Sequence, residues 1–335
     1  MTPIFMIGTQ RSGSNLLRLM LNQLKQIASP HPPHILERML PLIDCYGDLN
    51  VDDNFNQLID DVCKLINLNP VEWKDVKFNH QEIVNRCKEK SLMAVYAAVH
   101  DIYTENQGAE TWCCKSLSNI KYIDEIEAHF KKPLYIYLYR DGRDVALSFQ
   151  KAVVGEKHIY NIASEWAETQ ALAINLKKRI EPSRFFSVSY EQLTTQPVVT
   201  ARALCDFLNV NYTDDMLAFY RSSEARNAAS SSELWGNVGS PVNKNNTNKF
   251  LNEMNENSIE IFESVAGREL DELGYERYLI QKGKEIDFSV DEIEMFDNEN
   301  TRLKLQHKMN MDKDDMERRN IQSKLLSKIK SRNVA

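Results

Sequence analysis

The stretch FMIGTQRSGSNLLRLML, residues 5–21, decides the fold class. It passes from an apolar run into a Gly8-x-x-x-x-Gly13 loop and then into a segment with apolar residues at helical spacing. Such a turn aims backbone N–H groups and the positive end of a helix dipole at one point, which suits a phosphate or sulfate group. We therefore expect an anion site after a buried strand, formed by Gln10, Arg11, Ser12, Gly13, Ser14 and Asn15.

The loop lacks the residues that nucleoside triphosphate chemistry requires. A P-loop places Lys where Ser14 stands and a Mg²⁺-binding Ser or Thr where Asn15 stands. Arg11 supplies a cation inside the loop instead, and its planar guanidinium can bind two anionic oxygens together. The sequence thus predicts an anion site that works without a metal ion.

The rest of the chain predicts an α/β fold with a P-loop-like central parallel sheet flanked by helices. The length of 335 residues, with 42% hydrophobic and 27% charged residues, is ordinary for a soluble protein of one or two domains. Helical patterns alternate with β-rich runs, as in sheets with crossover helices. We expect strands at residues 4–8, 111–114, 134–139 and 185–190, helices within 145–180 and 197–208, and a long loop at 222–248.

The sequence also predicts how the chain is divided. Residues 1–280 form the main domain, and residues 40–108 within it form a helical insertion. Residues 281–335 form a charged C-terminal extension, in which Ile321, Leu325 and Ile329 recur at four-residue spacing. This pattern indicates a basic amphipathic helix, either solvated or in contact with a membrane surface or a partner.

Composition excludes several classes of function. The net charge of -7 argues against a general nucleic-acid binder. The six cysteines contain no CxxC pair, so they indicate neither a zinc site nor a disulfide framework. The chain shows no leader pattern and no run of about 18 apolar residues. We therefore expect a cytoplasmic protein without a bound metal.

A second motif, YLYRDGRDVALSFQKA, spans residues 137–152. Arg140 leaves the expected strand and Ser148 follows on a helix, so both can reach one ligand. Together the two motifs resemble the sulfotransferase superfamily, which uses 3′-phosphoadenosine-5′-phosphosulfate (PAPS). The resemblance implies that the first loop holds the 5′-phosphosulfate, whereas Arg140 and Ser148 hold the 3′-phosphate.

Further motifs extend this resemblance over most of residues 3–278. In WCCKSLSNIKYI, Lys115 takes the place of a lysine that contacts the sulfonate, and in SYEQL, Tyr190 matches a tyrosine near the nucleotide. SPVNKNNTNKF, residues 240–250, resembles the loop over the cofactor in tyrosylprotein sulfotransferases, with matches that include Asn243 and Lys249. The likeness is to bacterial and tyrosylprotein-type enzymes, because the catalytic histidine of the cytosolic small-molecule enzymes has no counterpart here.

Sulfuryl transfer sets requirements that specific residues can meet. Negative charge grows on the oxygen bridging to the departing phosphate, where we expect Lys115 and Arg11 to act. A hydroxyl acceptor also needs a base. The segment SPHPPHILERML, residues 29–40, offers His34, which Glu37 three residues later can orient, and His31 or Glu37 as alternatives.

Two other functions remain open from the sequence. One is a P-loop kinase or nucleotide-binding module that uses ATP, and the other is a donor-binding protein without catalysis. The acceptor is open as well: it can be a lipid, a carbohydrate, a small molecule or a protein tyrosine. We expect the insertion at residues 40–108 to decide among these acceptors.

Overall fold

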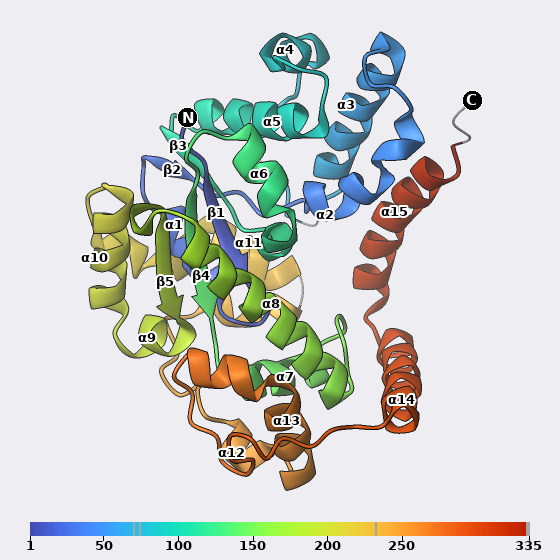
Figure 1. Cartoon of the computed structure of the whole chain (residues 1–335). Helices are drawn as coiled ribbons and strands as arrows, with labels where there is room; N and C mark the ends of the chain where they lie inside the picture. The colour runs from blue at the N-terminus through green and yellow to red at the C-terminus, as the bar shows by residue number, and fades with distance from the viewer. Residues whose placement is uncertain (70, 74, 232, 333–335) are drawn as a thin grey trace.

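The computed structural model describes residues 1–335 except 70, 74, 232 and 333–335. Within these residues, five parallel strands form one sheet in the order β2–β3–β1–β4–β5 (Figure 1). The predicted α/β fold is confirmed, and the sequence missed only the two-residue β2. The strands are β1 (Ile4–Gly8), β2 (Ile27–Ala28), β3 (Thr111–Cys114), β4 (Leu134–Tyr139) and β5 (Phe185–Ser189).

The central strand β1 is buried along its whole length. Successive side chains of a strand point to opposite faces, so Phe5 and Ile7 enter one apolar cluster while Ile4 and Met6 enter another. Parallel strands covered on both faces read as continuous apolar runs, which explains why this strand was visible in the sequence.

Helices cover both faces of the sheet (Figure 1). On one side, the cluster that contains Ile4 and Met6 takes residues from α1 (Ser14–Leu21), α9 (Tyr190–Thr195), α10 (Pro197–Leu208) and α11 (Ser223–Ser231). The prediction of a loop over residues 222–248 is wrong where α11 lies, because Ala225 and Ala228 are buried beneath its polar Ser and Asn residues. On the other side lie α6 (Ile123–His129) and α8 (Ile159–Arg179), and α7 (Gly142–Lys151) packs with α8 and α13 (Glu256–Glu272).

Helices also fill the segment between β2 and β3. They are α2 (Ile35–Met39), α3 (Asp52–Asn67), α4 (His80–Arg86) and α5 (Leu92–Asn106). Their apolar residues, such as Leu58 and Val99, belong to the same buried cluster as Phe5 of β1. This segment therefore packs directly on the sheet. Its boundaries at residues 40 and 108 stay a prediction, as do the predicted boundaries of the main domain and of the C-terminal extension.

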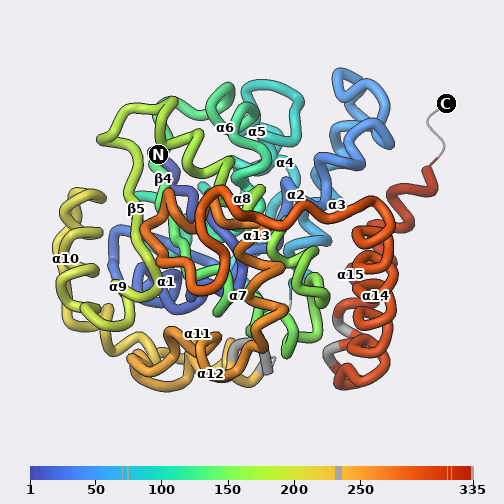
Figure 2. The backbone as a smooth tube through the Cα atoms, turned by 60° about the horizontal axis from the view of Figure 1, so that its bottom comes forward, coloured from blue at the N-terminus to red at the C-terminus, as the bar shows by residue number. Residues whose placement is uncertain are grey.

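The C-terminal extension forms two helices along one side of the molecule, α14 (Val290–Met309) and α15 (Lys313–Lys330) (Figures 1 and 2). Ile329 is fully buried in the same cluster as Phe5, whereas Ile321 is 43% exposed. One face of the last turns of α15 therefore packs on the protein itself, while the opposite face, with Lys324 and Lys328, is exposed to solvent as expected. Among the described residues, no helix has the length and apolarity needed to cross a membrane.

Candidate active site

The candidate site lies at the carboxyl edge of the sheet. Lys115 directly follows β3, Arg140 follows β4 and Tyr190 follows β5, while the Gly-rich loop follows β1. The carboxyl ends of adjacent parallel strands meet at one edge, where α/β proteins bind ligands. These residues line one cavity of about 1080 Å³. Of the residues predicted for the site, only Ser12 is absent from the lining, because it is fully buried. The predicted residues that line the cavity are Gln10, Arg11, Gly13, Ser14, Asn15, His34, Glu37, Lys115, Arg140, Ser148, Tyr190, Asn243 and Lys249.

The Gly-rich loop is held in a narrow range of conformations. Arg11 and Gly13 both have positive φ angles, 69° and 87°. A Cβ atom on Gly13 would lie 2.5 Å from the Tyr190 ring, so only glycine fits there. In the described structure, Oγ of the buried Ser12 has no hydrogen-bond partner. Because an unpaired buried polar group costs free energy, this loop suits an anion that would pair with it.

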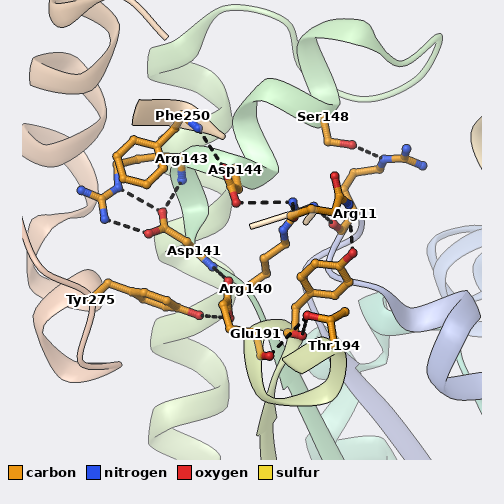
Figure 3. Close-up of polar contacts among 12 residues, drawn as sticks. Arg11, Arg140, Asp141, Arg143, Asp144, Ser148, Glu191, Thr194, Phe250 and Tyr275 are labelled. Atoms are coloured by element: carbon orange, nitrogen blue, oxygen red, sulfur yellow. Dashed lines mark hydrogen bonds and ion pairs between the residues drawn. The ribbon is translucent and has the colours of Figure 1, made fainter. Parts of the chain in front are cut away.

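The loop contacts α7 and the segment of residues 240–250 through two arginines (Figure 3). Nε of Arg11 donates a hydrogen bond to Oγ of Ser148 over 2.9 Å. Arg140 donates from Nη1 to the carbonyl oxygen of Arg11, over 3.1 Å, and from Nη2 to the carbonyl oxygen of Asn246, over 2.6 Å. Burial and the nearby charge of Arg140 lower the pKa of Arg11. Two guanidinium groups thus share one region, which favours an anion between them.

Tyr190 and Asn246 complete this part of the wall. The Arg140 guanidinium lies 4.4 Å from the centroid of the Tyr190 ring, a cation–π contact. Nδ2 of Asn246 donates to the Tyr190 hydroxyl over 2.9 Å. Asn243 and Lys249 lie exposed at the rim of the cavity. Sequence reasoning missed Asn246, whose only signal is its place inside the segment that resembles a cofactor-covering loop.

Two charged residues of the second motif tie the site to the surrounding helices (Figure 3). Asp144 lies 3.4 Å from Nη2 of Arg140 and accepts a hydrogen bond from the backbone N–H of Phe250 over 3.0 Å, at the start of α12 (Phe250–Glu253). Arg143 forms buried ion pairs with Asp141, at 2.8 Å, and with Glu263 of α13, at 2.6 Å. Asp144 thus helps to position Arg140, whereas Arg143 holds the helices together.

Lys115 lies in the cavity wall close to other cations. In the described part of the chain it forms no hydrogen bond or ion pair within the protein. Burial, followed by the charges of Arg18 and Arg11, lowers the pKa of Lys115 to about 7. Arg18 on α1 is fully buried and pairs with Glu224, but its Nε and Nη2 atoms have no partner among the described residues. An anion beside Lys115 would therefore relieve repulsion between cations.

His34 and Glu37 meet as the sequence predicted, although by a different local geometry. The helix α2 begins at Ile35, and His34 precedes it with a left-handed φ of 57°. Nδ1 of His34 lies 3.2 Å from Oε2 of Glu37, which also accepts a hydrogen bond from Oγ of Ser118 over 2.6 Å. The His34 ring and the Ser118 hydroxyl lower the pKa of Glu37 to about 2, and burial lowers the pKa of His34. At neutral pH this pair is a neutral imidazole beside a carboxylate, as a general base requires.

His31 lies in the same wall but is held more tightly. Its side chain is buried, and Nδ1 lies 3.2 Å from Oδ1 of Asn69. Its carbonyl oxygen accepts hydrogen bonds from Nδ2 of Asn69, over 2.8 Å, and from Nε1 of Trp73, over 2.7 Å. Burial, then the charge of Arg18, keeps the pKa of His31 well below its usual value. Both histidines are thus neutral near pH 7, and both remain candidates for the base.

Acidic and thiol side chains give no indication of a metal site. Within the described ranges, no cluster of three or more His, Cys, Asp or Glu residues is arranged to hold a metal ion. The donors that line the cavity include the loop and the cationic side chains of Arg11, Arg38, Lys115, Arg140, Lys151, Lys249 and Arg319. Such a set binds anionic oxygens.

Comparison with known proteins identifies the family of the chain. A model of the sulfotransferase family matches residues 3–214, so the chain belongs to this family. The structure is similar to a sulfotransferase domain from the curacin biosynthetic pathway, with a TM-score of 0.56, 22% identity, and coverage of 83% of this chain and 99% of that one. It is also similar to a sulfotransferase domain from the Synechococcus PCC 7002 olefin synthase, with a TM-score of 0.53, 20% identity, and coverage of 78% and 93%. These two likenesses show the fold. The sequence matches none of the curated proteins with which it was compared.

Proposed function

We propose that this protein transfers a sulfuryl group from PAPS to a hydroxyl or amine group of an acceptor. The observation that carries the proposal is the contact of Arg11 with both Ser148 and Arg140, beside the cavity wall that contains Lys115. A donor with a phosphate at each end of its ribose needs two separate anion sites. The Gly-rich loop and the Arg140–Ser148 region offer two such sites within one cavity.

The residues present fit this donor. Residues 10–15 would hold the 5′-phosphosulfate through backbone N–H groups and the Ser12 hydroxyl, which is buried without a partner in the described chain. Arg140, whose Nε atom is likewise buried and unpaired there, would hold the 3′-phosphate with Ser148. Tyr190, Asn243 and Lys249 would contact or cover the nucleotide. When bound, the donor supplies the sulfuryl group.

The protein's own residues have distinct roles in the proposed reaction. Lys115 and Arg11 donate hydrogen bonds toward the oxygen that gains charge, and so stabilise the transition state. His34 accepts the proton of the acceptor hydroxyl, while Glu37 holds the imidazole and stabilises its charged form. No step requires a metal ion, because these cations take the place that Mg²⁺ has in phosphoryl transfer.

Calorimetry tests the donor. We expect 3′-phosphoadenosine-5′-phosphate (PAP) to bind without a metal, and more tightly than ATP does with or without Mg²⁺. A preference for ATP that depends on Mg²⁺ would contradict the proposal and favour a kinase or an ATP-binding module. A labelled-sulfate assay with pooled acceptors then tests transfer. PAP binding without transfer to any pool would indicate a donor-binding protein that lacks catalysis.

A further inference from the structure

The C-terminal helices contribute one wall of the cavity. We call α14 and α15 the C-terminal arm, residues 290–330. Four residues of the arm line the same cavity as Lys115 and His34, although the residues after 214 lie outside the family match. We call the part of the lining contributed by residues 31–38, residue 69 and the arm the acceptor half. Apart from Pro32 its residues are polar or charged: His31, His34, Glu37, Arg38, Asn69, Asn310, Asp312, Arg319 and Gln322.

The arm is anchored at both ends, so this wall is a fixed part of the site. Near its start, Oδ1 of the buried Asn300 accepts hydrogen bonds from the backbone N–H groups of Lys157, over 2.8 Å, and His158, over 3.0 Å. Near its end, Ile329 is fully buried, and Nε2 of Gln322 donates to the carbonyl oxygen of Leu68 over 2.8 Å. Figures 1 and 2 show the arm, α14 and α15, passing along one side of the molecule.

Gln322 also holds Arg38, another residue of the acceptor half. Oε1 of the buried Gln322 accepts a hydrogen bond from Nη1 of Arg38 over 2.9 Å. The backbone N–H of Arg38 donates to the carbonyl oxygen of His34 over 3.1 Å, so Arg38 lies one helical turn from the proposed base. The side-chain amide of Gln322 therefore bonds to the backbone of Leu68 through its nitrogen and holds the Arg38 guanidinium through its oxygen.

The charge of Arg38 is not matched by an ion pair. Across the described residues, no carboxylate lies at ion-pair distance from its guanidinium, whose one hydrogen bond goes to the neutral amide of Gln322. Burial lowers the pKa of Arg38, and the charge of Glu37 raises it while that of Arg319 lowers it. Glu37 is engaged by His34 and Ser118, and Arg319 and Asp312 each have a contact within the chain. Within the acceptor half, Arg38 is thus the partly buried cation that can bind a ligand.

We infer that Arg38, positioned by Gln322 of the C-terminal arm, binds an anionic group of the acceptor. This inference rests on the proposed function, because it assigns a specificity residue to that same site. The acceptor would carry a carboxylate, phosphate or sulfate group in addition to the hydroxyl that His34 deprotonates. A guanidinium suits each of these groups, because it offers two parallel N–H donors to two anionic oxygens.

Titrations of the full chain saturated with PAP test the inference. The probes are three matched pairs: glucuronate and glucose, 4-hydroxyphenylacetate and its amide, and glycerol 3-phosphate and glycerol. We expect the anionic member of at least one pair to bind about tenfold or more tightly than its neutral partner. Arg38→Gln should remove this preference, and Arg38→Lys should restore part of it. Gln322→Leu should weaken the preference, because it frees Arg38 from its position.

Controls separate the possible outcomes. Arg302→Gln changes an exposed arginine of the arm that pairs with Glu299 and lies outside the cavity, so it should leave the preference intact. PAP affinity should be unchanged in all four variants, since none contacts the donor residues. Failure of the parent protein to bind PAP would contradict the proposed function. Normal PAP binding with equal affinity for both members of every pair, or with no binding of any probe, would overturn the inference about Arg38.

Discussion

Arg11 of the Gly-rich loop donates a hydrogen bond to Ser148 of α7 over 2.9 Å, across 137 residues of sequence. The sequence assigned these residues to different tasks, with Arg11 beside the sulfonate and Ser148 at the 3′-phosphate. Their contact brings the Arg11 side chain to the predicted 3′-phosphate site, while its charge also lowers the pKa of Lys115. One residue therefore links the two anion sites of the proposed donor.

Ser148→Ala tests whether the region around Arg140 and Ser148 binds the 3′-phosphate. We expect PAP affinity to fall about fivefold to tenfold, the worth of one hydrogen bond, because the alanine loses both the partner of Arg11 and a donor to the phosphate. AMP, which lacks the 3′-phosphate, should bind the variant as it binds the parent, as calorimetry can measure. The control is Ser164→Ala on α8, whose hydroxyl donates a hydrogen bond to the carbonyl oxygen of Tyr160 in the same helix. An equal loss for AMP and PAP would mean that Ser148 merely shapes the loop.

Gly13→Ala tests the fit of the loop against Tyr190. The added Cβ would lie 2.5 Å from the ring, and φ is 87°. Gly108→Ala is the matched control, because Gly108 also has a positive φ, 67°, but no atom within 4 Å of the added Cβ. In urea titrations we expect Gly108→Ala to lose about 1–2 kcal/mol of unfolding free energy from backbone strain, and Gly13→Ala to lose at least as much, because the overlap with the ring adds to the strain. Only Gly13→Ala should lose PAP affinity, by about tenfold or more; retained affinity would show that the loop can move away from Tyr190.

Lys115 predicts proton uptake on donor binding. With a pKa of about 7, it is mostly neutral at pH 8 in the free protein. A bound anion favours the charged form of Lys115 and so raises its pKa. The protein therefore binds as much as about one additional proton when PAP binds, and PAP affinity falls as pH rises from 7 to 9. Calorimetry in HEPES and Tris should give different apparent enthalpies at pH 8. Lys115→Arg stays charged and should remove the difference; identical enthalpies for the parent would disprove the coupling.

His34 predicts the acid limb of the pH profile. Burial lowers its pKa below the usual value of 6.5, and only the neutral imidazole can accept a proton. The turnover rate should therefore rise with pH through a midpoint below 6.5. His34→Gln should lower turnover by about 100-fold or more with PAP affinity unchanged. His31→Gln, which changes the neighbouring buried histidine, should keep the acid limb. If His31→Gln abolishes that limb instead, His31 is the base.

The sequence was sufficient for the sheet and for the residues at its edge. Strands β1 and β4 are buried on both faces and read as apolar runs, whereas β3 and β5 read as shorter β-rich runs. Lys115, Arg140 and Tyr190 directly follow β3, β4 and β5. Their convergence then follows from the parallel topology. The sequence could not show β2, since Ile27–Ala28 is too short to carry a pattern. Nor could it show the contact of Arg11 with Ser148, because side-chain direction depends on the left-handed backbone at Arg11.

Tertiary packing decided the elements that the sequence misjudged. The α11 segment has the Ser and Asn content of a loop, yet two buried alanines make it a helix against the sheet. The arm was recognised as a helix, but its partner lies 254 residues away, where Gln322 meets Leu68. A local pattern gives the apolar stripe of a helix and not the surface that covers it. The contribution of the C-terminal arm to the cavity could therefore not be predicted from the sequence.

The packing of the arm can be tested with two isoleucines of the same helix. Ile329 has 0% of its surface exposed and Ile321 has 43%. Ile329→Ala should lower the free energy of unfolding by about 2–5 kcal/mol, because it removes buried methyl groups and leaves a cavity. Ile321→Ala, the control, should change it by about 0.5 kcal/mol or less. Urea titrations measure both, and hydrogen exchange of α15 should speed up only in Ile329→Ala. Equal, small effects of the two substitutions would mean that α15 leaves the protein surface in solution, and the wall that positions Arg38 would then be lost.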